Sequence, residues 1–360
     1  MISKEDILKI IKAGTQAPSG DNSQPWEFKI QGDKVFVYNL PNRDNPILNF
    51  EQRGSYIAHG ALIENMVIAS KYFGYIVDIT IFPDQVDQNC TALLVFKGQQ
   101  DKNSGDDLYK YISQRSTNRK IYQSRPLLEN ERNILLGSID EINDSLSGRY
   151  KILFEETPSL RNDIGCLVSS VEQVILENKE LHNLLFKDVV WSEKKEKKQR
   201  HGLFIKTMEF SFPQMIAFWL ASHWWLMRIF IIIGLPKKIV ADDAHLYSSG
   251  TATVVITTSN TRPEDFIMVG RILQRFLLKA TKLGISTQLI TALLFTAMRL
   301  SSKNKTFLLP RHKKLVQDNY NKLKMIFDVK SDIIAMLLRI GFTDGPSAYS
   351  SRMEPVFRKL

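Results

Sequence analysis

Two stretches of equal length would each be apolar on most sides if they formed helices. Both begin and end with glycine. Residues 60–74 read GALIENMVIASKYFG, and residues 270–284 read GRILQRFLLKATKLG. Apolar residues coincide when the stretches are aligned: Leu62 with Ile272, Ile63 with Leu273, Met66 with Phe276, Val67 with Leu277, Phe73 with Leu283. Each stretch predicts a buried helix that stops at its second glycine. Their likeness has two interpretations, a coincidence between core helices or a duplicated unit folded as a pseudo-dimer.

Strand-like segments surround both predicted helices and favour the duplication. The first helix is followed by YIVDITIF (75–82) and TALLVF (91–96). The second lies between TATVVITT (251–258) and GISTQLI (284–290), and IIAMLLRIGF (333–342) is apolar throughout, as in a buried strand. Alternating helices and strands in both halves predict an α+β or α/β layered architecture.

The segments around these units read as a capped helix, a linker and a charged loop. The first residues, MISKEDILKIIKAG, predict an amphipathic helix capped by Ser3 and Asp6, with Ile7, Ile10 and Ile11 on one face. They lack the architecture of a secretory signal, so we expect a cytoplasmic protein. GQQDKNSGDD (98–107) is the predicted linker between the halves. WSEKKEKKQRHG (191–202) reads as a solvated surface loop, and because it lacks interleaved aromatic residues we expect no nucleic-acid partner.

One apolar segment, residues 215–235, has the length of a membrane helix. It contains His223 and Arg228, however, and an arginine inside a bilayer costs a few kcal/mol. We favour a pair of buried or lid helices. A weak membrane-surface contact through Trp224, Trp225 and Phe230 and a true membrane span are the alternatives.

Composition narrows the range of chemistry. The chain has 360 residues, 44% of them hydrophobic and 24% charged, which suits two domains or one large intertwined unit. Its net charge of +10 favours anionic partners. Cys90 and Cys166 are too far apart in sequence to indicate a disulfide framework or a zinc site, so we expect a reducing compartment. The patterns GxxxxGK[ST], GxGxxG, HExxH and GxSxG are absent. Asp242, Asp243 and His245 could bind a cation, but we favour a capped turn before the strand at 251 and predict no metal site.

Two polar segments remain as candidates for chemistry. Residues 17–26 read APSGDNSQPW, a run of small hydrogen-bonding residues that ends in a tryptophan. Residues 114–122 read QRSTNRKIY, in which Arg115, Thr117 and Arg119 alternate and can face one side of an extended backbone. Two guanidinium groups and a hydroxyl would cradle a phosphate. The alternative is that these arginines pair with surface carboxylates.

Together, APSGDNSQPW and RSTNR resemble the FMN-dependent nitroreductase family. The order of the two motifs resembles its Acg-like branch, whose members are single-chain pseudo-dimers with one flavin site under a lid. The resemblance extends to RxxIAHGALIEN (53–65), GRILQRFLLKATKLGIS (270–286), WSEKKEKKQRHGLF (191–204) and LLRIGFTDGPSAYSSRMEPVF (337–357). It implies an α+β, nitroreductase-like fold with residues 1–104 as one half, 105–360 as the other, and a helical lid insertion at about 190–247.

The resemblance also implies the residues that hold FMN. Ser19, Gly20 and Asn22 would line the ring or the ribityl chain, and Gln24 and Pro25 belong to the same loop. Arg115, Thr117, Arg119 and Arg352 would hold the phosphate. Thr291 and Ala292 align with the family's backbone contact near flavin N5. Trp26 reads as a structural anchor of the loop rather than a stacking partner of the flavin.

If FMN is bound, the resemblance implies an oxidoreductase with no catalytic side chain, which takes hydride from NADH or NADPH and passes it to a second substrate by a ping-pong route. A nitroaromatic, a quinone or a small metabolite would be the acceptor. The alternative functions are an FMN-sequestering protein with little turnover, and a membrane-surface reductase of lipophilic quinones. Because a fused pseudo-dimer completes its own site, we expect a monomer.

Overall fold

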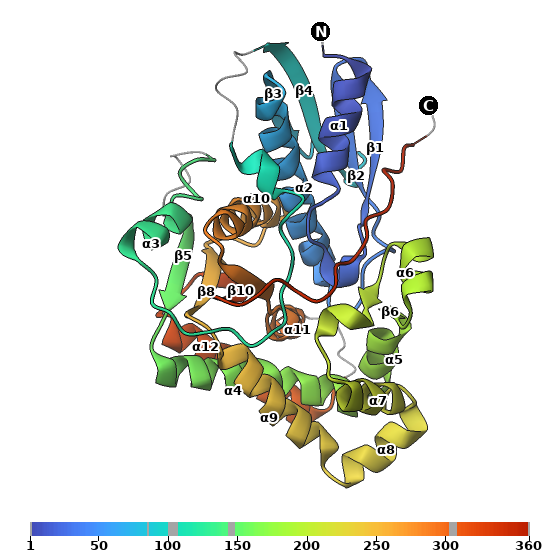
Figure 1. Ribbon diagram of the computed structural model, residues 1–360, viewed down its shortest axis with the longest axis vertical. Helices are drawn as coiled ribbons and strands as arrows, with labels where there is room; N and C mark the ends of the chain where they lie inside the picture. Colours follow the sequence, from blue (N-terminus) through green and yellow to red (C-terminus); the bar gives the residue numbers. More distant parts are fainter. Residues whose placement is uncertain (1, 85, 100–106, 143–147, 302–307, 359–360) are drawn as a thin grey trace.

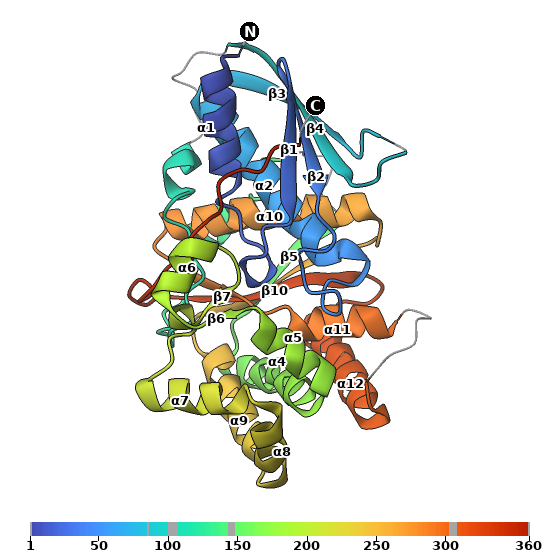
Figure 2. The same ribbon diagram turned by 90° about the vertical axis from the view of Figure 1, so that its right-hand side faces the viewer.

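The computed structural model describes residues 2–84, 86–99, 107–142, 148–301 and 308–358 (Figure 1). Within these residues, two four-stranded antiparallel sheets lie on either side of a pair of long helices, α2 and α10 (Figures 1 and 2). The α+β class expected from the sequence is therefore confirmed.

The first half contains one sheet and two helices. Its sheet has the strand order β1-β2-β4-β3, with every neighbouring pair antiparallel. The predicted N-terminal helix is confirmed, because the Ser3 hydroxyl accepts a hydrogen bond from the Asp6 amide (3.0 Å) and the three isoleucines are buried. The elements are α1 (Lys4–Gly14), β1 (Trp26–Gln31), β2 (Lys34–Asn39), α2 (Arg53–Tyr72), β3 (Tyr75–Ile81) and β4 (Cys90–Gln99).

The second half repeats this order and adds further helices. Its sheet has the order β5-β8-β10-β9, so the first, second, fourth and third strands are neighbours in both sheets. In each half the long helix connects the second strand to the third. The elements are α3 (Glu129–Leu136), β5 (Tyr150–Glu155), β8 (Ala252–Thr258), α10 (Pro263–Lys282), β9 (Ser286–Leu289), α11 (Ala292–Leu300), α12 (Pro310–Ile326) and β10 (Ile333–Gly341).

The two long helices cross backbone to backbone at glycine. A Cβ added to Gly60 would lie 1.9 Å from the carbonyl oxygen of Ile267, and one added to Gly270 would lie 2.0 Å from that of Ile57. These two contacts are equivalent under the alignment of the two glycine-bounded stretches. The crossing is therefore as symmetric as the sequence pattern, and only a residue without a side chain fits at either position.

Charged and amide side chains join the same two helices beside the crossing. Glu64, fully buried on α2, accepts from Arg271 (2.9 Å) and Arg275 (2.6 Å) on α10. Burial alone would raise the pKa of Glu64, but the two guanidinium groups together hold it below its usual range. Gln274 also donates to the Asn65 amide oxygen (2.7 Å). Because the buried carboxylate is fully paired, this polar interface fixes how the halves meet.

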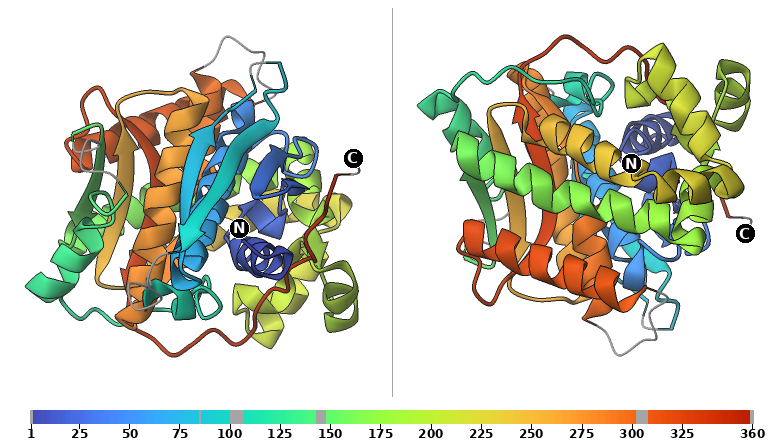
Figure 3. Two further views of the ribbon diagram at one scale, coloured as in Figure 1. Left: turned by 90° about the horizontal axis from the view of Figure 1, so that it is seen from above. Right: turned by 90° about the horizontal axis from the view of Figure 1, so that it is seen from below.

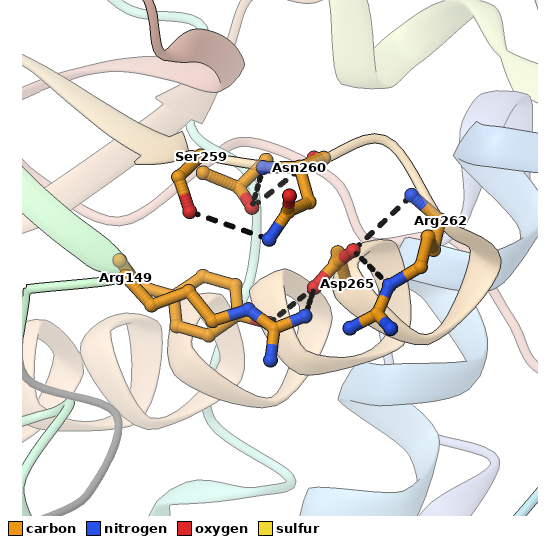
Figure 4. A network of polar contacts seen from close by, with 7 residues as sticks. Arg149, Ser259, Asn260, Arg262 and Asp265 are labelled. Carbon is orange, nitrogen blue, oxygen red and sulfur yellow. Dashed lines mark hydrogen bonds and ion pairs between the residues drawn. The ribbon is translucent and has the colours of Figure 1, made fainter.

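The start of α10 is held by a second buried carboxylate (Figure 4). Asp265 accepts from the amide and the side chain of Arg262, which caps the helix. It also accepts from Arg149 and from the Tyr150 hydroxyl (2.9 Å), both at the start of β5. The helix that crosses α2 is thereby tied to the edge strand of the second sheet.

A long insertion between β5 and β8 forms the outer layer. Helices α4 (Pro158–Glu177) and α9 (Leu235–Ser248) lie side by side against the second sheet, on the face away from α10 (Figure 3). Between them the chain forms α5 (Lys179–Lys187), β6 (Val189–Val190), α6 (Glu193–Gln199), β7 (Leu203–Phe204), α7 (Phe212–Ala221) and α8 (Trp224–Ile232). We call residues 190–233 the lid.

The C-terminal segment returns from the second half to the first. After β10 it runs along the lid and reaches β1, where the Phe28 amide donates to the Val356 carbonyl (2.9 Å) and the Arg358 amide donates to the Phe28 carbonyl (2.8 Å) (Figure 1). We call residues 342–358 the tail. It adds an edge to the first sheet and connects the two halves a second time.

Two sequence predictions within the insertion are wrong. The charged run at 191–202 contains a helix, α6, because Ser192 caps it and its own Glu196 is buried on the inner face, although its lysines are exposed as expected. Asp242, Asp243 and His245 lie inside α9 rather than in a turn, because Ile239 and Tyr247 pack into hydrophobic clusters at helical spacing. Among the described residues, no group of three or more metal-ligating side chains is found.

Other predictions agree with the structure where it describes them. The strands expected at 75–82, 91–96, 251–258, 284–290 and 333–342 all form, and both long helices begin seven residues earlier than the glycine-bounded stretches. Cys90 and Cys166 are both free thiols. The linker expected at 98–107 and the boundary at 104 fall mostly on residues 100–106, which lie outside the described residues.

We predict that Gly60→Ala and Gly270→Ala each destabilise the protein by about 3 kcal/mol, the upper end of overpacking costs, because each new methyl group meets a backbone carbonyl. Chemical unfolding would measure the change. Gly345→Ala is the matched control, since an added Cβ there has only one neighbour within 4 Å, at 3.7 Å. Equal stability of all three variants would contradict the close crossing.

Candidate functional site

A polar cavity of about 260 Å³ lies where the two halves, the lid and the tail meet. Four segments distant in sequence line it: the loop after α1, residues 113–119, the lid at 202–207, and the tail at 348–352. Its lining residues are Gln16, Pro18, Ser19, Asp21, Asn22, Ser113, Arg115, Ser116, Thr117, Arg119, Gly202, Leu203, Thr207, Ala348, Tyr349, Ser350 and Arg352.

The loop after α1 is held in a strained backbone conformation. Asp21, Asn22 and Gln24 have φ values of 44°, 57° and 50°, in the left-handed region that residues with a side chain disfavour. Each such residue costs about 1–2 kcal/mol. The Ser19 hydroxyl accepts from the Gln24 amide (3.0 Å) and closes the loop on itself. Strain of this kind persists only where surrounding contacts determine the conformation.

Gln24 supplies several of those contacts. Its side chain is completely buried, and its amide nitrogen donates to the carbonyls of Arg200 in the lid (2.7 Å) and Asn22 (3.2 Å). Its amide oxygen accepts from the Met353 amide in the tail (2.9 Å). Gln24 therefore joins the loop, the lid and the tail, and it does not line the cavity.

Pro25 and Trp26 anchor the end of the loop. The Pro25 carbonyl can only accept, so the His59 Nε2 that lies 2.9 Å from it carries the hydrogen. Nδ1 then accepts from the Thr91 hydroxyl (2.8 Å). The buried Trp26 ring packs edge-on against His59, with ring centroids 6.2 Å apart. Trp26 is thus the structural anchor that the sequence indicated, and burial lowers the pKa of His59 to about 4.

The arginine segment of the second half runs beside the end of the second sheet. Thr117 forms a parallel bridge with Thr287 of β9, and the Asn118 amide donates to the Thr287 carbonyl (3.0 Å). The backbone is extended here, so alternate residues share a side, and Arg115, Thr117 and Arg119 all line the cavity. The spacing of these three residues led to the same expectation.

Arg115 is a buried cation without a partner. Its side chain is only 8% exposed, and among the described residues no hydrogen bond or ion pair reaches its guanidinium group. Burial, with a smaller contribution from Arg352, lowers the pKa of Arg115 to about 9. The group therefore stays protonated at neutral pH, and a positive charge faces the cavity uncompensated.

Two further arginines surround the same cavity. Arg119 donates to the Thr207 carbonyl (3.1 Å), which connects it to the lid. Arg352 donates to the Asn22 amide oxygen (2.8 Å), which connects the tail to the loop. Burial lowers the pKa of both, for Arg352 to about 10 against the opposing effect of Glu196. Arg115, Arg119 and Arg352 thus converge from two elements far apart in sequence, and each has donors left over.

Nearby carboxyl groups do not cancel this charge fully. Asp21 lines the cavity, but burial and the neighbouring Asp188 raise its pKa, against the effect of Arg119. Asp44 lies behind Gly20, 3.1 Å from where a Cβ would stand, and burial raises its pKa to about 7. Three arginines outnumber these two carboxyl groups, and burial disfavours the ionised form of both, so the cavity suits an anionic group.

The structure brings together six of the eleven residues expected at the site: Ser19, Asn22, Arg115, Thr117, Arg119 and Arg352. Gly20 faces Asp44 instead, and Gln24 and Pro25 support the loop from behind. Thr291 and Ala292, at the start of α11, do not line the cavity.

Sequence reasoning did not assign several lining residues. Thr207 and Gly202 come from the lid, and Ala348 and Tyr349 come from the tail. Gly202 has a φ of 91°, and a Cβ there would lie 2.6 Å from the Asp188 carbonyl oxygen, so the glycine in QRHGLF marked a special turn. Tyr349 gave no comparable signal, because its place depends on the path of the tail.

Comparisons with known proteins give one kind of match. No family model matches the sequence, and no curated protein matches it. Among solved structures, the chain is similar to a putative nitroreductase from Anabaena variabilis, with 8% identity and a TM-score of 0.42 over 86% of this chain and 69% of that chain.

It is also similar to an oxidised iodotyrosine deiodinase bound to FMN and 3-iodo-L-tyrosine, with 13% identity and a TM-score of 0.39 over 70% of this chain and 97% of that chain. A nitroreductase with bound FMN from Bacteroides fragilis shows 9% identity and a TM-score of 0.35 over 69% of this chain and 94% of that chain. The structural neighbours are therefore nitroreductase-like flavoproteins. At such identities the likeness concerns the chain path alone.

We predict that Arg115→Met makes the ligand-free protein more stable, by about 1–3 kcal/mol, because a buried unsatisfied polar group costs about that much and more when charged. The matched control is Arg161→Met. Arg161 is equally buried (6% exposed), but it donates to Ser124 and to the carbonyls of Glu156, Ser248 and Gly250. That variant should lose stability. Thermal unfolding of both would check the contrast, and a loss of stability in Arg115→Met would indicate an ordinary structural arginine.

His59 predicts a specific loss of stability in mild acid. Its pKa in the folded protein, about 4, lies below the ordinary value of 6.5. The neutral imidazole therefore contributes fully to the free energy of unfolding above pH 6.5, and this contribution is lost as pH falls towards 4. Between pH 7 and pH 5 the loss should reach about 2 kcal/mol, at about 1.4 kcal/mol per pH unit. Urea unfolding of wild type and His59→Gln at both pH values would isolate it. Parallel pH dependence in the two proteins would refute the assignment.

Proposed function

We propose that the protein is a flavin oxidoreductase that binds FMN in this cavity, with the phosphate between Arg115, Arg119 and Arg352. The observation that carries the proposal is the buried, unpartnered guanidinium of Arg115. A fold does not bury a free charge without cost, and a dianionic phosphate is a group that would pair with it.

The residues present fit the phosphate end of FMN. Thr117 adds a hydroxyl to the three guanidinium groups, and Arg119 and Arg352 are already oriented by Thr207 and Asn22. A phosphate with three acceptor oxygens can use the donors that remain. The likeness in chain path to FMN-bound proteins agrees with this choice of anion.

The cavity is small for a ligand of the size of FMN. At about 260 Å³ it lies just below the usual range of about 300–1,000 Å³ for small-molecule sites. A second cavity, of about 700 Å³, also borders Arg119 and lies between the lid at 208–214 and α9. We infer that the lid wall shifts when a ligand as large as FMN enters.

FMN, when bound, would accept and release hydride, and the chain would contribute binding, orientation and exclusion of water. Ser19 and Asn22 of the loop, Leu203 of the lid and Tyr349 of the tail line the same cavity and would contact the bound flavin. NADH or NADPH is the proposed donor, and a nitroaromatic, a quinone or a small metabolite is the proposed acceptor. No side chain has to act as a nucleophile in such a reaction.

We further propose that the site belongs to an internally duplicated pseudo-dimer. The equal strand order of the two sheets and the symmetric glycine crossing support duplication. The loop comes from the first half and Arg115 from the second, so one chain supplies all the lining residues. This arrangement favours a monomer as the working form.

The direct test of FMN binding is the visible absorbance of the purified protein, which should show a flavin spectrum. Arg115→Met should retain FMN at least about tenfold less well, because a charge-assisted hydrogen bond contributes about 1.5–3 kcal/mol and tenfold corresponds to 1.4 kcal/mol. The control is Arg311→Met, an exposed arginine paired with Glu177. A colourless protein whose thermal stability does not respond to added FMN would end the proposal.

One observation favours the alternative function of FMN sequestration. Several hydrogen bonds close the lid onto the tail and the loop. Glu196 accepts from the Ser351 amide (2.6 Å) and hydroxyl (2.7 Å), and Glu209 accepts from Ser347 in the same way (both 2.7 Å). A lid held at this many points would slow the exchange of donor and acceptor.

Steady-state oxidation of NADH and NADPH with menadione or a nitroaromatic distinguishes the two functions. The oxidoreductase proposal predicts turnover, and Glu196→Gln together with Glu209→Gln should raise it severalfold by loosening the lid. Bound flavin that neither nucleotide reduces, in wild type or in the loosened variant, would favour the sequestering protein.

A further inference from the structure

The two lid helices α7 and α8 carry apolar side chains on the outside of the molecule. Each helix exposes three large residues at the same helical spacing of four and three positions. These six side chains are between 44% and 85% exposed: Phe212, Ile216, Trp219, Trp225, Ile229 and Ile232. We call them the outer stripe. A helix that faced water would carry polar residues at these positions.

The outer stripe is not the face by which α7 and α8 pack on the protein, because a different, inner face of both helices already makes those contacts. Met215 and Phe218 of α7 contact the cluster around Val190 and Phe204. Ala221 and Met227 are buried in a neighbouring cluster with Trp224. The hairpin is therefore apolar on two sides, and only one of them is covered by this chain.

The charged residues within the segment that carries the outer stripe are all positive. Arg228, Lys237 and Lys238 are exposed, and residues 211–240 contain no aspartate or glutamate. A segment that combines exposed apolar and aromatic side chains with cations and no anions is typical of helices that lie in the interface of an anionic membrane. We propose that the α7–α8 hairpin docks on the surface of a bilayer that contains anionic phospholipid.

The geometry of the hairpin favours a surface contact over a membrane span. In the part of the chain that the structure describes, no single helix passes for a span by length and hydropathy; α7 and α8 pass only as a pair, with a bend of 106° between them. Their 10 and 9 residues reach about 15 Å each, against about 30 Å for the hydrocarbon core. Because the inner face stays packed on the protein, only the outer stripe is free to enter the lipid.

The position of the hairpin leaves it accessible. Figures 1 and 2 show α7 and α8 at the end of the molecule opposite the N-terminus and the C-terminus. A second copy of the chain is the other partner to consider. A twofold contact through the outer stripe would bring the same cations of both copies together, which opposes association. An anionic bilayer surface instead attracts Arg228, Lys237 and Lys238.

Co-sedimentation with vesicles tests the proposal, using flavin-free protein so that the result is independent of the proposed function. We expect binding to vesicles of phosphatidylcholine and phosphatidylglycerol (3:1) at low salt, and binding at least tenfold weaker to phosphatidylcholine alone. The variant Trp225→Ser, Ile229→Gln, Ile232→Gln should bind at least tenfold less well. Since all three side chains are exposed, the fold should survive, and circular dichroism would check it.

Two matched controls distinguish vesicle binding through the hairpin from nonspecific binding through exposed apolar or basic residues elsewhere. Ile121→Gln, Leu128→Gln, Met325→Gln removes three exposed apolar side chains elsewhere and should bind as wild type does. Lys237→Gln, Lys238→Gln should weaken binding severalfold, whereas Lys314→Gln, Lys322→Gln should not. Absence of vesicle binding, undiminished binding of the stripe variant, or self-association that the stripe variant abolishes without any vesicle binding would each overturn the proposal.

Discussion

The contact on which the rest of the structure depends is the crossing of α2 and α10 at Gly60 and Gly270. Carbonyl oxygens of Ile57 and Ile267 occupy the space where a Cβ would stand, so the helices meet at one register only. Glu64, paired with Arg271 and Arg275, specifies the same register by charge. In sequence, each helix connects the second strand of its sheet to the third. Fixing the crossing therefore also fixes how the two sheets face each other.

The candidate site follows from that register. It requires the loop at 17–26 of the first half to lie against Arg115 and Arg119 of the second half, and the tail to reach back over both. The side chains that support the loop, Gln24 and His59, have their hydrogen bonds satisfied, whereas the guanidinium group of Arg115 has no partner among the described residues. A preorganised anion site has this arrangement: fully hydrogen-bonded side chains hold the loop in place around one unpaired cation. The fold has then already positioned the charge before the ligand binds.

Much of the fold could be predicted from the sequence because its signals are local. Periodicity located α2 and α10, continuous apolar runs located β8 and β10, and the alternation in QRSTNR placed Arg115, Thr117 and Arg119 on one side. Properties that depend on tertiary contacts could not be predicted. Three such properties depend on segments that meet only after folding: the role of Gln24 as a link between lid and tail, the burial of Glu196 on one face of the charged helix α6, and the place of Tyr349 in the cavity.

The unpaired charge of Arg115 is central to the proposed function, because we propose that it binds the phosphate of a flavin. Calorimetric titration of the flavin-free protein with FMN and with riboflavin, which lacks only the phosphate, measures this directly. Two or more charge-assisted hydrogen bonds of about 1.5–3 kcal/mol each should make FMN bind at least about 100-fold more tightly. In Arg115→Met the difference should shrink at least tenfold. Equal affinities for FMN and riboflavin in the wild-type protein would contradict the claim.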